Sequence, residues 1–208
     1  MKTMRAFALL GGLATATFAG GQAQAASCVS DPNFQGALVS TALGAGTCTL
    51  MGGQVTFDLT TNNLPVGATA ALSFSESTSG FSVNIFPNGF IGLASGTGNV
   101  TYTLASLTGP LSGVRLDSTT NNGSPATIVT KRILETGTSL ASTNGSVADA
   151  SLTSQVLLTV TDAFTVTNST GTLFSFTNEF FVPEPMTLGM FGVGLAGLGW
   201  ARRRRAVA

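Results

Sequence analysis

The stretch Asn99-Val-Thr-Tyr-Thr-Leu-Ala105 decides the fold, because apolar and polar side chains alternate along it without a break. Successive side chains of a β-strand point to opposite faces, so Val100, Tyr102 and Leu104 are expected to share a buried face. Disorder is the competing interpretation of a chain so rich in Thr, Ser, Gly and Asn, but a period of two is typical of strands. The stretch therefore predicts a strand with one face in a hydrophobic core.

Similar segments recur at short spacing on both sides of this stretch, with turn-forming residues such as Asn144-Gly145 between them. The expected strands are Gln54–Thr60, Ala68–Glu76, Phe81–Phe86, Gly89–Ala94 (a hairpin partner of the strand before it), Asn99–Ala105, Val114–Asp117, Ala126–Thr136, Gln155–Asp162, Phe164–Thr167 and Leu173–Phe181. Many short alternating strands with polar turns predict an all-β protein, an antiparallel β-sandwich of the Ig-like or jelly-roll-like kind.

Two of these segments carry expectations about individual residues. We expect Val156, Leu158 and Val160 to point inward. Phe174, Phe176 and Phe180 are expected on one face of the last strand. The exported part shows no convincing amphipathic helix, and Ser139–Asp149 is expected to be a flexible loop.

The first 25 residues have the three parts of a secretory signal peptide. Two basic residues precede an apolar run, and Ala23-Gln24-Ala25 forms a small-residue cleavage site before Ala26. A first transmembrane anchor is the alternative, but the run is short and rich in small residues. We therefore expect export by the general secretion machinery and cleavage by signal peptidase.

Cys28 and Cys48 are the only cysteines of the chain. In an exported protein they favour a disulfide over a metal site or a free thiol. The bridge would staple Ser27–Gly53, a glycine-containing segment expected to form little helix or strand of its own.

The C-terminal tail combines three features in a fixed order: Pro183-Glu184-Pro185, an uncharged glycine-rich run from Met186 to Ala201, and a block of four arginines. As a helix the run would span roughly 24 Å, somewhat less than the ~30 Å hydrocarbon core of a bilayer. Trp200 and the arginines would lie at the interface, and the positive charge would keep the C-terminus in the cytoplasm. A buried core helix or a disordered apolar tail is the alternative, but many glycines make a poor helix in water.

This tail resembles the PEP-CTERM sorting signal. The matching residues are Pro183, Glu184 and Pro185, the apolar helix 186–201, and the cluster Arg202, Arg203, Arg204 and Arg205. The resemblance implies a secreted bacterial protein of Gram-negative type, held transiently in the inner membrane and cut near the triplet by an exosortase, a membrane-embedded cysteine protease. It also implies an association with exopolysaccharide and biofilm. Because the family is defined by its tail, the resemblance implies nothing about the fold or activity of residues 26–181.

The exported part is acidic. Between Ala26 and Pro185 the chain has three basic and nine acidic residues, a net charge of −6. Nucleic-acid binding would require a basic patch, so a nucleic-acid partner is not expected.

The chain lacks histidine, the usual general base and the commonest metal ligand. With both cysteines in a disulfide, the usual nucleophile arrangements are also missing, so no enzyme and no cofactor are expected. The pair Asp31 and Asn33, and Asp117 with Asn121 and Asn122, offer oxygen ligands for calcium, but capping of turns explains them more simply.

These observations together predict a non-enzymatic protein of the cell surface or extracellular matrix, with exopolysaccharide a possible partner. A secreted carbohydrate- or calcium-binding module is the alternative. Tyr102, the only tyrosine, is expected in the core, which leaves few aromatic side chains for a sugar-binding face.

Overall fold

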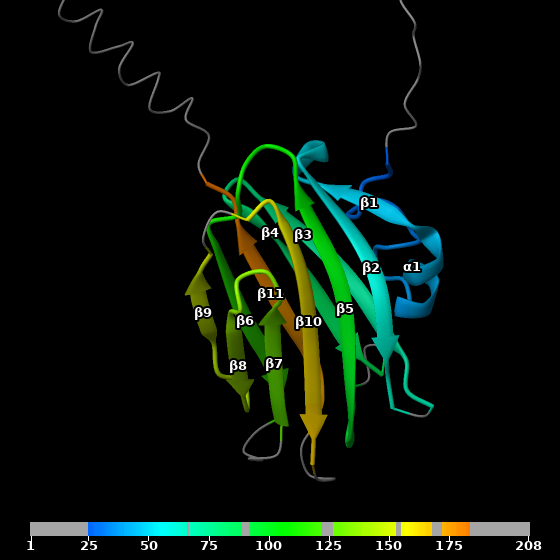
Figure 1. Cartoon of the computed structure of the whole chain (residues 1–208). Helices are drawn as coiled ribbons and strands as arrows, with labels where there is room; N and C mark the ends of the chain where they lie inside the picture. Colours follow the sequence, from blue (N-terminus) through cyan, green and yellow to red (C-terminus); the bar gives the residue numbers. More distant parts are fainter. Residues whose placement is uncertain are drawn as a thin grey trace, which may run out of the picture.

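Two antiparallel β-sheets pack face to face in the computed structural model (Figure 1). The structure describes residues 25–65, 67–88, 92–121, 127–152, 155–167 and 172–183. The predicted antiparallel β-sandwich is confirmed over these residues.

Within these ranges the first sheet has six strands in the order β1-β2-β5-β10-β7-β8. Their bounds are Thr47–Leu50 (β1), Val55–Asn63 (β2), Gly96–Ser106 (β5), Leu157–Val166 (β10), Thr127–Ile133 (β7) and Ser139–Thr143 (β8). The second sheet has five strands in the order β3-β4-β11-β6-β9. Their bounds are Ala70–Ser77 (β3), Gly80–Pro87 (β4), Leu173–Phe181 (β11), Gly113–Thr120 (β6) and Ala148–Ser151 (β9). The last strand, β11, therefore lies in the middle of its sheet.

Aromatic rings from the two sheets meet in the core. The ring centroids of Phe57 in β2 and Phe74 in β3 are 5.0 Å apart. Tyr102 of β5 is fully buried, as predicted, and its ring lies 6.5 Å from that of Phe180 in β11. Each such ring buries a large apolar area, so these contacts account for much of the packing between the sheets.

The N-terminal segment has more regular structure than predicted. It forms the α-helix α1 (Val39–Ala45), the strand β1 and a short 3-10 helix, η1 (Met51–Gly53). Glycines weaken a helix or strand, but tertiary contacts override them here, because α1 buries Val39 and Ala42 and β1 pairs with β2. The predicted disulfide between Cys28 and Cys48 is confirmed and ties this segment together.

The expectation of a flexible loop at Ser139–Asp149 was wrong. Residues 139–143 form β8 at the edge of the first sheet, and residues 148–151 form β9 at the edge of the second. Leu140 and Ser142 of β8 point inward. The prediction failed because these strands are short and their inward positions include serine and alanine.

Two strands near the C-terminus also differ from expectation. Gln155–Asp162 and Phe164–Thr167 form one strand, β10, which begins at Leu157, so Val156 lies outside it and is 51% exposed. In β11 the pairing register shifts between Leu173 and Ser175, which turns Phe174 outward and leaves it 37% exposed. A bulge of this kind reverses the side-chain alternation locally.

The predicted strand Gly89–Ala94 falls partly outside the described residues, which omit 89–91. Its described part does not pair with β4 as a hairpin. Leu93 instead forms an isolated bridge with Leu173, while the neighbours of β4 are β3 and β11.

Candidate functional site

The junction between the sandwich and the C-terminal tail is well defined. β11 ends at Phe181, the Val182 N–H donates a hydrogen bond to the Ser79 carbonyl at 3.0 Å, and Pro183 is exposed. The core of the sandwich is thus complete before the PEP triplet begins. The other predicted sorting and membrane-retention residues, Glu184, Pro185, Trp200 and Arg202–Arg205, lie outside the described residues.

The predicted signal-peptide cleavage site lies at the other end of the described chain. Ala23 is outside the described residues, whereas Ala25 and Ala26 belong to them. The Ala26 carbonyl accepts a hydrogen bond from the Thr49 N–H at 2.8 Å, beside the edge strand β1. In Figure 1 the first and last described residues lie at the same end of the sandwich.

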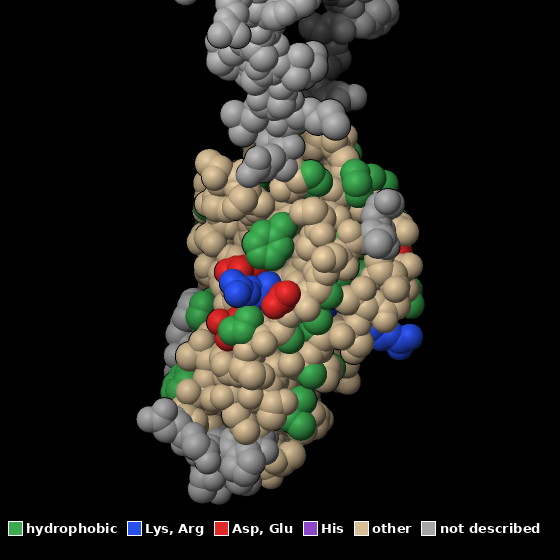
Figure 2. Space-filling view, turned by 90° about the vertical axis from the view of Figure 1, so that its left-hand side faces the viewer, with side chains coloured by type: hydrophobic (Ala, Val, Ile, Leu, Met, Phe, Trp, Pro, Cys, Tyr) green, Lys and Arg blue, Asp and Glu red, His purple; other side chains and the backbone are tan. Residues whose placement is uncertain are grey.

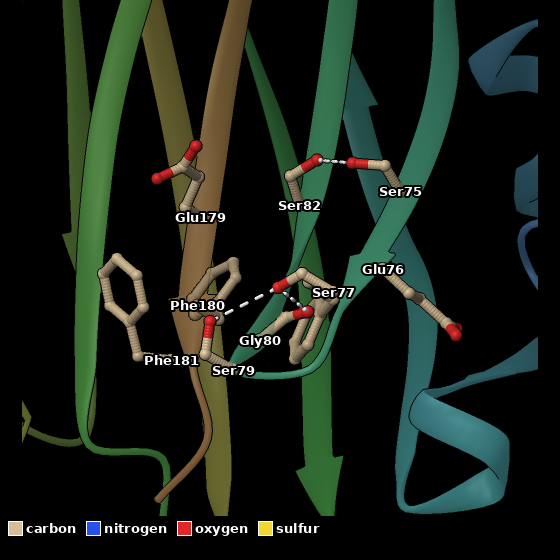
Figure 3. Close-up of a pocket in the computed structure, with 10 residues that line it drawn as sticks. Ser75, Glu76, Ser77, Ser79, Gly80, Ser82, Glu179, Phe180 and Phe181 are labelled. Carbon is tan, nitrogen blue, oxygen red and sulfur yellow. Dashed lines mark hydrogen bonds between the residues drawn. The ribbon is translucent and has the colours of Figure 1, made fainter. Parts of the chain in front are cut away.

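A shallow hollow of about 250 Å³ lies beside the tail junction, at the turn between β3 and β4 (Figure 3). Hydroxyl groups dominate its polar lining, and the Ser75 and Ser82 hydroxyls are hydrogen-bonded to each other at 2.7 Å. Glu179 and Phe181 contribute a carboxylate and an aromatic ring. The hollow can offer hydrogen bonds to a polar ligand.

The outer face of β6 and β11 carries a small group of charges, seen in Figure 2 as blue and red side chains on a mostly uncharged surface. Arg115 pairs in register with Glu179 on one side and with Asp149 on the other. Its guanidinium lies 3.6 Å from the Glu179 carboxylate, and the two side chains are 46% and 41% exposed. Such an exposed pair contributes little to stability.

A second group of polar side chains lies in the core, where Lys131, Asp162 and Asn178 are all fully buried. Lys131 is in β7 and Asp162 in β10, and the two residues face each other directly in the ladder of the first sheet. Asn178 is in β11 of the opposite sheet. The three side chains therefore meet between the sheets. We refer to them, with Tyr102, as the buried polar cluster.

The Asp162 carboxyl lies between the other two groups. Lys131 Nζ is 3.3 Å from Asp162 Oδ1, and Asn178 Nδ2 donates a hydrogen bond to Asp162 Oδ2 at 2.7 Å. Lys131 Nζ also donates a hydrogen bond to the Tyr102 hydroxyl at 3.3 Å and lies 4.8 Å from the centroid of the Phe180 ring. The amine and the carboxamide thus contact different oxygens of one carboxyl group.

Hydrogen bonding within this cluster is incomplete. Asp162 Oδ1, although 3.3 Å from Lys131 Nζ, and Asn178 Oδ1 are both buried without a hydrogen-bond partner among the described residues. Buried polar atoms of this kind are uncommon, because each loses its hydration without replacement. The cluster therefore calls for an explanation beyond packing.

Burial shifts the titration of all three ionisable members of the cluster toward their neutral forms. Loss of hydration lowers the pKa of Lys131 to about 8, against the opposing attraction of Asp162. The same loss raises the pKa of Asp162, although Lys131 and Asn178 partly offset it. Burial, followed by repulsion from Asp162, raises the pKa of Tyr102. Burial thus disfavours the charged form of each group, while the attraction between Lys131 and Asp162 opposes that effect.

Sequence reasoning missed this cluster, although a signal was present. Lys131 is in phase with the inward Val129 and Ile133, and Asp162 is in phase with Val160 and Phe164. A charged residue that keeps the apolar phase of its strand indicates a buried polar group. Burial of a charge is costly, so the alternation alone did not lead us to place these two charged residues in the core.

Three of the candidate calcium ligands, Asp31, Asn33 and Asn121, make hydrogen bonds within the protein. Asp31 Oδ1 accepts hydrogen bonds from the Asn33 N–H at 2.8 Å and from Asn33 Nδ2 at 2.9 Å, which is the turn capping expected above. Asn121 Oδ1 accepts the Thr172 N–H at 2.7 Å, whereas Asn122 lies outside the described residues. In the described part of the chain no group of three acidic or sulfur ligands could hold a metal ion.

Residues 181–205 match the family model of the PEP-CTERM protein-sorting motif, which confirms the resemblance of the tail. The motif implies an exported, exosortase-processed extracellular protein with a transient membrane anchor before processing. Among the described residues no helix is long and apolar enough to span a membrane, and the predicted helix 186–201 lies outside them. No curated protein and no solved structure matches the chain.

Proposed function

We propose that the sandwich is a non-enzymatic structural protein of the cell surface or extracellular matrix, associated with the exopolysaccharide of a biofilm. The observation that carries this proposal is the position of the sorting motif, which begins where β11 ends. Cleavage near the triplet would release residues 26–182 without removing any strand. The released domain would carry its full core to the outside of the cell.

The residue types of the chain support a structural role. Histidine is absent, and both cysteines are joined in a disulfide. The hollow beside the tail junction is shallow, and serine hydroxyls make up most of its polar lining. Hydroxyl and amide groups that repeat along the exposed strand faces would hydrate the protein and contact polymer without a dedicated pocket.

The proposal is tested by replacing Pro183, Glu184 and Pro185 with alanine in the native host. We expect the uncut form to accumulate in the inner membrane, detected by immunoblotting of fractions and by sequencing of the C-terminal peptide. The matched control is Thr187→Ala, just beyond the triplet, which should be processed normally. Release of the triple variant from the cells at the normal rate would rule out processing at the motif.

A carbohydrate-binding role is the second candidate, favoured by the serine-lined hollow with Glu179 and Phe181 on its wall. Titration of the released protein with exopolysaccharide from the same host would test it. We expect Ser75→Ala combined with Glu179→Gln to weaken binding, and Ser139→Ala, at an exposed position on β8, to leave it unchanged. Equal binding by both variants would assign any affinity to other surfaces.

A further inference from the structure

The buried polar cluster has the components of an amide-forming reaction. It holds an amine nucleophile on Lys131, a carboxamide electrophile on Asn178 and an acid–base group on Asp162, all inaccessible to water. A lysine amine is a nucleophile only when it is unprotonated, and burial in an apolar site favours that form. Tyr102 and the Phe180 ring surround the amine and exclude solvent.

From this arrangement we infer that Lys131 and Asn178 become joined by an intramolecular isopeptide bond, with Asp162 as the catalytic proton carrier. Lys131 Nζ attacks Asn178 Cγ, a new Nζ–Cγ amide bond forms, and the Cγ–Nδ2 bond breaks to release ammonia. Asp162 takes one proton from Nζ through Oδ1 and supplies one to the departing Nδ2 through Oδ2. One amine and one primary amide give one secondary amide and ammonia, so the reaction requires no oxidant, metal or cofactor.

The positions of the three groups suit this exchange of protons. The oxygen of Asp162 nearest the amine is Oδ1, at 3.3 Å, and the oxygen that contacts the departing nitrogen is Oδ2, at 2.7 Å. General acid–base catalysis requires such contact with both the nucleophile and the leaving group. Holding the reactants together in a rigid core replaces the encounter of two molecules by a reaction within one.

The product also fits the core better than the reactants do. The reaction replaces an ionisable amine and a primary amide by one neutral secondary amide, so the core no longer contains an amine that can carry a charge. Burial of charge is costly in an apolar interior, and the unbonded cluster leaves Asp162 Oδ1 and Asn178 Oδ1 without hydrogen-bond partners. The bond would link β7 of the first sheet to β11 of the second.

The test is a peptide map of the protein produced from the full chain. A bacterial host exports it by means of the chain's own N-terminal leader. Trypsin cleaves after Arg115, Lys131 and Arg132, the only basic residues between Ala26 and Pro185. With the bond present, peptide 116–132 should remain attached to the peptide that begins at Ile133 and contains Asn178. The combined mass should be lower than the sum of the two by one ammonia molecule.

Fragmentation of the branched peptide must place the link at Lys131 and Asn178. Ammonia loss alone is insufficient, because cyclisation at Asn122-Gly123 or Asn144-Gly145 also releases ammonia. Complete separation of the two tryptic peptides in the folded wild-type protein would overturn the inference. A branch from Lys131 to Asp162, with loss of water instead, would overturn the assignment of Asn178.

Two variants examine the roles of the groups. Asp162→Asn keeps the shape of the side chain but cannot carry the protons, and we expect at least a tenfold lower yield of branched peptide in protein that remains folded by circular dichroism. Lys131→Met removes the nucleophile and should give no branched peptide. A full yield of branched peptide from folded Asp162→Asn protein would exclude the catalytic role of Asp162. Since the map of the wild-type protein is independent of tail processing, its outcome is separate from that of the function proposed above.

Discussion

Lys131 and Asp162 lie opposite each other in the β7–β10 ladder, with Nζ and Oδ1 3.3 Å apart and both side chains fully buried. Their neighbours, Tyr102 and Asn178, complete a polar group within a core built mainly from aliphatic and aromatic side chains.

Removing one member of this pair should destabilise the fold strongly. We expect Lys131→Met to lower the free energy of unfolding by about 3–5 kcal/mol, because Asp162 is left buried without the nitrogen beside it and the link to Asn178 cannot form. Chemical denaturation followed by circular dichroism measures the change. The double variant Lys131→Met/Asp162→Leu should regain part of the loss, and a double variant less stable than the single one would contradict this explanation.

The exposed pair on the outer face provides a contrast. Arg115→Ala removes the partner of Glu179, but both side chains are nearly half exposed, at 46% and 41%. We expect a cost of less than about 1 kcal/mol, because water solvates the remaining carboxylate. The same denaturation experiment tests this. A loss as large as that of Lys131→Met would mean that the outer face contributes to stability through contacts other than this ion pair.

The Asn178→Ala variant should show a pH dependence that the wild type lacks. Without Asn178 the isopeptide bond cannot form and Lys131 keeps its amine, whose pKa is lowered to about 8 in the folded state. The unfolded chain then binds more protons than the folded one, so the free energy of unfolding should rise as the pH is raised from 8 toward 10. Asp162 acts in the opposite direction, because its raised pKa means that the folded chain holds this proton to a higher pH than the unfolded chain does. Tyr102 also opposes the rise. Its pKa is raised in the folded state, so the free energy of unfolding falls once the phenol of the unfolded chain ionises, above about pH 10.

Denaturation midpoints at several pH values below 10 test this prediction. Lys131 is the only lysine of the exported part, so Lys131→Met is a direct control that should remove the rise. A parallel rise in the wild type would indicate that its lysine is still a free amine.

Two glycines form a matched pair for testing backbone packing. A Cβ added to Gly98 in β5 would lie 2.6 Å from Phe164 Cζ and 2.9 Å from the Asn63 carbonyl oxygen. We therefore expect Gly98→Ala to destabilise the protein by about 1–3 kcal/mol. Gly44 in α1 has open space around it, and Gly44→Ala should stabilise the helix by about 0.5–1 kcal/mol. Thermal unfolding of both variants should show midpoint shifts of opposite sign.

The disulfide should contribute measurably to stability. Cys28 and Cys48 are separated by 20 residues, for which the chain-entropy model gives about 3 kcal/mol. We expect the double variant Cys28→Ser/Cys48→Ser to unfold at a correspondingly lower denaturant concentration. A reducing agent should weaken the wild type to the same extent and leave the double variant unchanged. An equal effect of the reductant on both proteins would indicate an action elsewhere.

Alternation predicted much of the fold because each strand carries its own pattern. The inward positions of Val100, Tyr102 and Leu104 follow from seven residues of sequence and needed no knowledge of the neighbouring strands. The outward turn of Phe174 could not be predicted in this way, since it results from a bulge that exists only in the pairing with β6.

The buried polar cluster needed information that alternation does not contain. The phase of β7 and β10 placed Lys131 and Asp162 inward, but the register that sets them opposite each other depends on which strands become neighbours. The approach of Asn178 depends on how the two sheets are stacked. The sorting motif of the tail, in contrast, is contiguous in the sequence and was recognised from a few residues without any knowledge of the fold.

The central position of β11 determines how the domain would respond to tension on its tail. A pull at Val182 along the strand would load the ladders with β4 and β6 together, in shear, since the hydrogen bonds of both run across the direction of the force. An edge strand under the same pull would be held by one row of hydrogen bonds, whereas β11 is held by two. The domain is therefore built to withstand extraction forces on the tail while the protein is still attached to the membrane.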